Sequence, residues 1–100
     1  MTTFTKAVKR APALPRKLRA ISHVLSDPRR LQILKHVAAQ SCTACSDLRA
    51  VFPISAATLS HHLKELESSG LIETTRRGKF VDIVFRREAW KAYLAELEKL

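Results

Sequence analysis

The positions of the four prolines and two glycines constrain the fold most strongly, because nearly every one marks the start or the end of a segment. Asp27-Pro28 has the order of a helix N-cap followed by proline in the first turn, which predicts a helix from about residue 28 to 39. Pro53 ends a short helix before it, and Gly70 suits the C-terminal end of the helix predicted at residues 55–68.

Apolar residues at helical spacing predict two further helices and the buried faces. The stripe of the first helix is Leu14, Leu18, Ile21 and Leu25, and that of the last is Trp90, Leu94 and Leu97. In the second helix we expect burial of Leu31, Leu34 and Ala38, with Ile33 and Val37 alongside. The helix at 55–68 is expected to bury Leu59, Leu63 and Leu66.

After Gly70 the pattern changes from helical to alternating. Residues 71–77 and 79–86 are rich in Thr, Ile, Val and Phe, and the turn Arg77-Gly78-Lys79 joins them, which predicts a β-hairpin. The predicted fold is therefore mainly α, in the order α-α-α-α-β-β-α. Because a lone hairpin is unstable, this one must pack on the helices.

Positive charge is concentrated near the N-terminus. The chain carries a net charge of +9, and residues 1–35 contain nine basic residues against Asp27 alone. We therefore expect a basic N-terminal arm at residues 1–13 ahead of one domain at residues 14–100. An excess of this size favours a polyanionic partner, either nucleic acid or an anionic membrane surface.

Several classes of protein are not expected. No apolar run approaches the roughly 18 residues of a membrane span, and the first residues lack a hydrophobic signal core, so we expect a cytoplasmic protein. Two cysteines are too few for a secreted disulfide framework. Nothing supplies an oxyanion hole, a phosphate loop or a carboxylate pair, so we do not expect an enzyme.

The third and fourth helices, joined through residues 52–55, have the arrangement of a helix-turn-helix. With the leucines turned inward, the opposite face of residues 55–68 is small and polar, as a helix that enters a major groove requires. The candidate DNA contacts are Ser55, Ala57, Thr58, Ser60, His61 and Lys64. A solvated helix face is the alternative interpretation. His62 flanks the leucine stripe, and we expect it to be a hydrogen-bonded packing residue.

The hairpin favours the DNA-binding interpretation. Its tip carries Arg76, Arg77 and Lys79, three cations placed to contact a phosphate backbone or an adjacent minor groove. A helix-turn-helix followed directly by a basic hairpin is typical of a winged helix-turn-helix protein. We therefore predict that the partner is double-stranded DNA.

Two segments resemble the ArsR/SmtB family of transcriptional repressors. The first is Leu25-Ser-Asp-Pro-Arg-Arg-Leu-Gln-Ile-Leu34, and the second is Ser55-Ala-Ala-Thr-Leu-Ser-His-His-Leu-Lys-Glu-Leu-Glu-Ser-Ser-Gly-Leu-Ile72, followed by the basic turn. The resemblance implies a homodimeric repressor of a palindromic operator, released by an inducer. It also implies a dimer interface on the first and last helices, through Leu14, Leu18, Ile21, Leu25, Trp90, Leu94 and Leu97.

The cysteines are the candidates for sensing an inducer. Many family members carry Cys-Val-Cys before an Asp-Leu pair, but aligning Asp47-Leu48 puts Ala44 and Ser46 at those positions. Residues 86–100 contain no His, so the family's other common metal site is absent as well.

Three interpretations of Cys42 and Cys45 remain open. They can form a regulatory disulfide, or supply two soft ligands to Zn²⁺, Cd²⁺ or As(III) with His36 as a third, or have no sensing role. Two rival function classes are a protein-interaction module and a membrane-associated protein. The basic wing argues against the first, and prolines in the N-terminal arm argue against a long amphipathic helix for the second.

Overall fold

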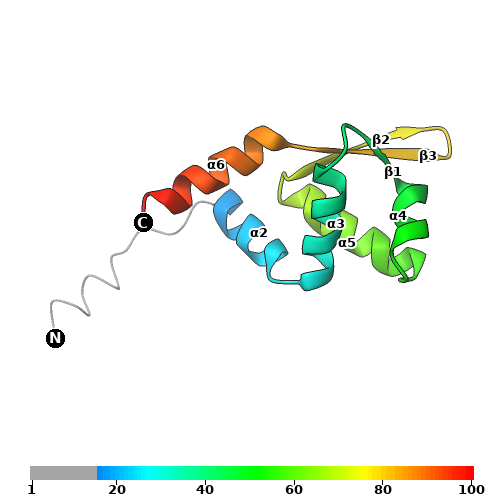
Figure 1. The fold of residues 1–100 in the computed structure, drawn as a ribbon, viewed down its shortest axis with the longest axis horizontal. Helices are drawn as coiled ribbons and strands as arrows, with labels where there is room; N and C mark the ends of the chain where they lie inside the picture. The colour runs from blue at the N-terminus through cyan, green and yellow to red at the C-terminus, as the bar shows by residue number, and fades with distance from the viewer. Residues whose placement is uncertain (1–15) are drawn as a thin grey trace, which may run out of the picture.

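The computed structural model describes residues 16–100, which form five helices and a small antiparallel sheet. The helices are α2 (Arg16–Leu25), α3 (Pro28–Ala38), α4 (Cys45–Val51), α5 (Ala56–Ser68) and α6 (Arg87–Glu98). The strands are β1 (Thr43–Ala44), β2 (Ile72–Arg77) and β3 (Phe80–Phe85). Figure 1 shows α2 and α6 at one end of the domain, and α4 with the hairpin turn at the other. Leu14 and the predicted arm at residues 1–13 lie outside the described residues.

The predicted order of helices and hairpin is confirmed, and the structure adds one short strand. β1 precedes α4 and pairs antiparallel with β3, so that Thr43 faces Ile83 and Ala44 faces Asp82. The sheet order is β1-β3-β2, which places β3 at its centre. The hairpin is therefore attached to the chain segment that leads into the helix-turn-helix, as well as to α5.

The hydrophobic core lies between the helices and the sheet. Its fully buried apolar members are Val24, Ile33, Val37, Leu48, Leu59, Leu66, Leu71 and Ile83. The predicted inward stripe of α5 is confirmed, since Leu59, Leu63 and Leu66 are all buried. The opposite face of the same helix is therefore directed away from the core.

Local signals set the ends of the elements as the sequence indicates. The Asp27 carboxylate accepts hydrogen bonds from the backbone N–H groups of Arg29, at 2.8 Å, and Arg30, at 3.2 Å, and so caps α3. The Ser55 hydroxyl accepts from the Thr58 N–H at 3.1 Å and caps α5. Gly70 and Gly78 have φ of +85° and +62°, a backbone region that residues with a side chain rarely adopt.

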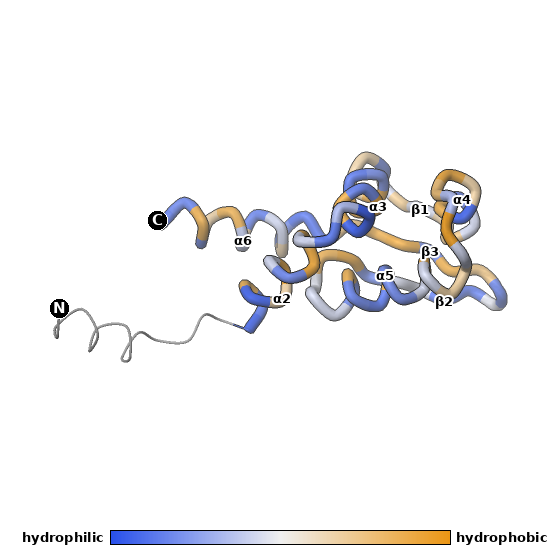
Figure 2. Tube along the Cα trace, turned by 90° about the horizontal axis from the view of Figure 1, so that it is seen from below, coloured by the Kyte–Doolittle hydropathy of each residue, from blue (hydrophilic) through white to orange (hydrophobic). Residues whose placement is uncertain are grey.

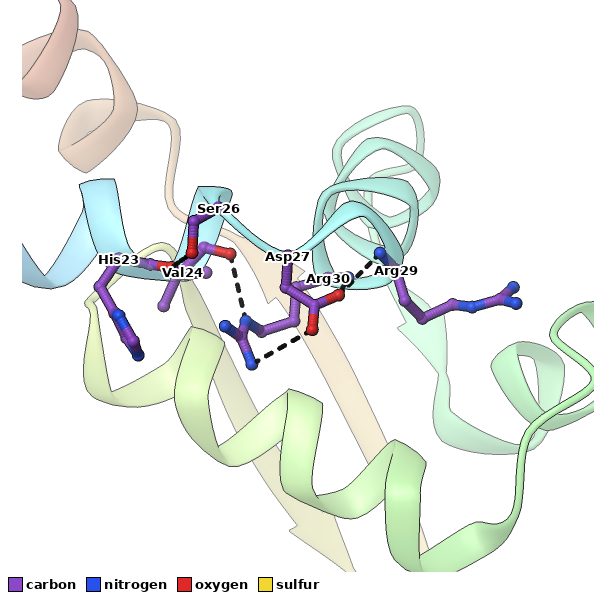
Figure 3. Close-up of polar contacts among 6 residues, drawn as sticks. All are labelled: His23, Val24, Ser26, Asp27, Arg29 and Arg30. Carbon is purple, nitrogen blue, oxygen red and sulfur yellow. Dashed lines mark hydrogen bonds and ion pairs between the residues drawn. The ribbon is translucent and has the colours of Figure 1, made fainter.

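The buried face of α3 differs from the prediction chiefly at Leu31, and Ala38 is only partly buried. Leu31 is 38% exposed, whereas the neighbouring Arg30 is only 8% exposed. Figure 3 shows the Arg30 side chain extending toward the end of α2, where its Nε donates to the Val24 carbonyl at 3.1 Å. The guanidinium also lies 3.8 Å from the Asp27 carboxylate. These polar contacts make burial of an arginine tolerable and rotate Leu31 outward.

Helix α6 is covered by the rest of the domain on one side only. Tyr93 is buried and its hydroxyl lies 3.1 Å from the Ser22 hydroxyl, which links α6 to α2. Leu94 and Leu97 are exposed, and Figure 2 shows hydrophobic and hydrophilic stretches alternating along this helix. Within residues 16–100 no helix is long and apolar enough to cross a membrane.

We predict that Leu66→Ala will lower the free energy of unfolding by about 2–5 kcal/mol, because it leaves a cavity behind the centre of α5. Urea denaturation followed by circular dichroism measures this change. Val51→Ala is the matched control: Val51 is 53% exposed, and its replacement should change the stability by no more than about 0.5 kcal/mol. Equal effects of the two substitutions would contradict the assignment of Leu66 to the core.

Candidate nucleic-acid interface

The exposed face of α5 carries most of the predicted DNA contacts. Ala57, Thr58, Ser60, His61 and Lys64 are all exposed in the structure. Ser55 is also exposed, but its hydroxyl is already engaged, since it accepts from the Thr58 N–H and donates to Thr58 Oγ1 at 2.8 Å. Ser55 therefore contributes by fixing the start of α5. The small and polar surface that follows it leaves room for close approach of a partner.

The wing, defined as residues 76–80, exposes three cations to solvent. One of them is ion-paired within the described residues, and two are not. Arg77 donates from Nε to the Asp82 carboxylate at 2.6 Å, and this hydrogen bond raises the pKa of its guanidinium. Arg76 and Lys79 form no ion pair within residues 16–100. One cation is thus oriented by an acidic neighbour, and two are available to an anionic partner.

A cavity of about 300 Å³ separates the wing from α5. Ser60 and Lys64 line it from α5, and Arg76 lines it from β2. Because side chains alternate along a strand, Arg77 points to the other face of the hairpin, where it lines a second cavity of about 210 Å³ with Lys79. The hairpin therefore has basic residues on both of its faces.

Arg49 of α4 is a basic residue of this surface that sequence reasoning missed. It is exposed and lines both cavities beside the wing. Like Lys64, it forms no ion pair in the described part of the chain. The sequence shows only an isolated cation on a short helix; the pairing of β1 with β3 brings that helix beside the wing.

A hydrogen-bonded contact joins α5 to β2, the strand that leads into the wing. The Glu67 carboxylate accepts from the Thr74 N–H at 3.3 Å and from the Thr74 hydroxyl. These bonds join the C-terminal half of α5 to β2. The exposed face of α5 and the base of the hairpin therefore belong to one packed unit.

His62 is buried on the side of α5 opposite its exposed face, as expected. It is 7% exposed, but among residues 16–100 its Nδ1 has no hydrogen-bond partner, so the expected hydrogen bond is not found at this nitrogen. Burial lowers the pKa of His62 from its ordinary value of 6.5, with Asp27 acting in the opposite direction. The cluster in Figure 3, in which Arg30 pairs with Asp27, is close enough to act on this imidazole electrostatically.

The two cysteines lie on either side of β1. Cys42 is exposed, Cys45 is partly buried as the first residue of α4, and both are free thiols. His36 bonds instead to Gln40, at 3.0 Å, and its ring meets the ring of Phe52. Among residues 16–100 no cluster of three or more His, Cys, Asp or Glu side chains could hold a metal ion. The predicted third ligand is therefore not brought to the cysteines.

The residues expected at a dimer interface occupy one end of the domain. Leu18, Leu25 and Trp90 are partly buried against the core, and Leu94 and Leu97 are exposed. Ile21 is only 3% exposed and packs inside its own chain. Leu14 lies outside the described residues.

Comparison with known proteins identifies the family. Residues 25–75 match the family model of a helix-turn-helix domain. A crystal structure of an ArsR family transcriptional regulator superimposes with a TM-score of 0.77, at 26% identity over 84% of this chain and 91% of that one. This chain belongs to the ArsR family of helix-turn-helix proteins.

The chain is also similar to two other proteins. The arsenical resistance operon repressor of Staphylococcus xylosus is 43% identical over 63 residues, which are 63% of this chain and 60% of that protein. The solution structure of a homodimeric winged helix-turn-helix DNA-binding domain from Mycobacterium bovis has a TM-score of 0.68 at 23% identity, with 89% of each chain covered. The match to the Staphylococcus repressor thus spans only 60% of that protein's length.

We predict that the buried imidazole of His62 makes the stability of the domain depend on pH. As the pH falls below about 6.5, the unfolded chain binds a proton that the folded chain resists, so the free energy of unfolding decreases until the lower folded pKa is reached. His62→Gln should flatten this part of the profile in urea titrations at successive pH values. His61→Gln, which changes an exposed ring, should leave it in place; a loss of the slope in that variant alone would contradict the assignment.

Proposed function

We propose that this ArsR-family chain binds double-stranded DNA as a homodimer and represses transcription from a palindromic operator until an inducer releases it. The observation that carries the proposal is the surface on which the exposed residues Ser60 and Lys64 of α5 line one cavity with Arg76 of the wing. In this role α5 enters a major groove and the wing lies along the flanking backbone. A DNA-binding repressor of this kind works in the cytoplasm.

The proposed contacts divide into two kinds. Ala57, Thr58, Ser60 and His61 are small or can form hydrogen bonds, which suits them to base edges, while Lys64 suits a phosphate. Arg76, Arg77 and Lys79 of the wing hold the DNA backbone. Ser55 supports these contacts through its cap on α5. The first group would set sequence preference, and the second would set general affinity.

A twofold dimer would complete the DNA-binding unit. The exposed Leu94 and Leu97 extend an apolar surface from α2 onto α6, next to a cavity of about 240 Å³ lined by Leu18 and Tyr93. A second copy of the chain is the occupant that the homodimeric Mycobacterium domain suggests. Two copies of α5 would then lie roughly 34 Å apart, one turn of DNA, and match an inverted repeat.

We also propose a chemical class for the inducer. Thiol oxidation at Cys42 and Cys45 is the mode that we favour, because the cysteines flank the strand that joins α4 to the wing. The alternative is a soft metal or metalloid, Zn²⁺ or As(III), bound by the same two thiols, which the similarity to the arsenical resistance repressor suggests. That ion would need a further ligand from the partner chain or the solvent. A repressor that does not sense through its cysteines is the remaining possibility.

We predict that binding to a random-sequence duplex will depend steeply on salt. If the dimer makes about 6–10 phosphate contacts, its affinity should fall by about 10³–10⁵ between 50 and 200 mM salt, because counterions are released from the DNA. Fluorescence anisotropy at successive salt concentrations measures the slope. Arg76→Ala should reduce the slope by about 1, whereas Lys91→Ala on α6 should not. A flat salt response of the wild-type protein would exclude DNA binding of this type.

We also predict that the N-terminal arm acts on affinity alone. Deleting residues 1–13 removes Lys6, Lys9 and Arg10, so binding to all duplexes should weaken alike and the salt slope should flatten. Competition between two unrelated duplexes for the deleted and the full chain measures the effect. A changed order of preference between the duplexes would show that the arm reads sequence.

A further inference from the structure

The two cysteines lie at the two ends of β1, with only its two residues between them. Cys42 precedes Thr43, and Cys45 follows Ala44 as the first residue of α4. Both strand residues pair with β3, Thr43 opposite Ile83 and Ala44 opposite Asp82. Any covalent bond between the two sulfur atoms therefore has to close around a paired strand.

That closure is incompatible with the strand geometry. An extended strand rises about 3.3 Å per residue, which separates the Cα atoms of Cys42 and Cys45 by about 10 Å, and Ala44 is extended at φ −77° and ψ 141°. A disulfide requires Cα atoms about 4.4–6.8 Å apart. Residues three apart along a strand also start from opposite faces. The bond can form only if Thr43 and Ala44 leave their extended conformation, which removes their pairing with β3.

The loss of β1 would reach the proposed DNA-binding surface directly. Thr43 is completely buried, so unpairing exposes part of the core. Asp82, the register partner of Ala44, is the carboxylate that orients Arg77 in the wing. Cys45 lines both cavities beside the hairpin, one of which also reaches Lys64 of α5. Displacing β1 therefore shifts α4, with Arg49, relative to the wing and to the cavity that the wing shares with α5.

We propose that Cys42 and Cys45 are a modification site at which a hydroperoxide forms an intramolecular disulfide, and that this disulfide breaks the pairing of β1 with β3 and releases DNA. The proposal rests on the DNA-binding function proposed above. In this proposal the two-residue strand β1 keeps the wing in place as long as no disulfide joins Cys42 and Cys45.

The hydroperoxide accepts the two electrons that disulfide formation releases. The exposed Cys42 thiolate attacks one oxygen of the hydroperoxide, breaks the O–O bond and becomes a sulfenic acid, while the leaving oxygen takes up a proton as an alcohol or water. Cys45 then attacks the sulfenic sulfur, forms the S–S bond and expels hydroxide, which takes up the thiol proton as water. The two thiols lose two electrons in total, and the peroxide gains them.

The test compares the full chain before and after treatment with tert-butyl hydroperoxide. Mass spectrometry under non-reducing conditions should show one disulfide within the monomer. Hydrogen exchange should become faster at residues 43–44 and at the facing residues 82–84. Affinity for a duplex that binds the reduced protein should fall by about 5- to 150-fold, the usual range of coupling between two sites. Dithiothreitol should restore all three properties.

Cys42→Ser is the matched control, because it removes the exposed thiol and keeps β1 unchanged. This variant should bind DNA like the reduced wild type both before and after the oxidant. An intramolecular disulfide that leaves the exchange of β1 or the affinity unchanged would overturn the proposal, and so would a failure of the oxidant to form that disulfide. If the reduced protein binds no duplex at all, the proposed function fails, and the exchange measurement still decides whether the disulfide unpairs β1.

Discussion

The structure depends on the burial of one stripe of α5. Leu59, Leu63 and Leu66 fix the rotation of this helix against the core, with His62 closing the same face under the Arg30–Asp27 pair. Burial of three leucine side chains contributes several kcal/mol, far more than any single polar contact at the surface. Because the inward face is fixed, the outward face from Ala57 to Lys64 is fixed as well. The proposed DNA-binding surface is therefore a consequence of the core.

The second constraint is the pairing of β3 with strands on both of its sides. β2 continues from α5 and is joined to it again through Glu67 and Thr74, while β1 leads into α4. The hairpin is thus held by the two helices of the helix-turn-helix at once. This arrangement explains why cations that are far apart in the sequence, Arg49, Lys64 and Arg76, line one cavity.

Local sequence signals predicted the helices, their caps and the hairpin, because each depends on neighbouring residues. They could not predict β1, since two residues show no periodicity and this strand exists only through its partners on β3. The burial of Arg30, where Leu31 was expected to be buried, has a similar cause. Arg30 is buried because the Val24 carbonyl and the Asp27 carboxylate satisfy it, and hydropathy alone does not contain that information. The positions of the predicted site residues on α5 followed from the helical wheel and those of the wing from the turn at Gly78, whereas Arg49 required the tertiary fold.

In the proposed dimer, α5 and the wing of each subunit act together on one DNA duplex. Selection of binding sequences by the full-length reduced protein from a pool of random duplexes tests this claim most directly. We expect enrichment of an inverted repeat whose half-site centres lie about 10 base pairs apart, the spacing that a twofold pair of α5 helices in adjacent major grooves requires. Enrichment of an unrepeated sequence, or no enrichment from a pool that the protein nevertheless binds, would contradict it.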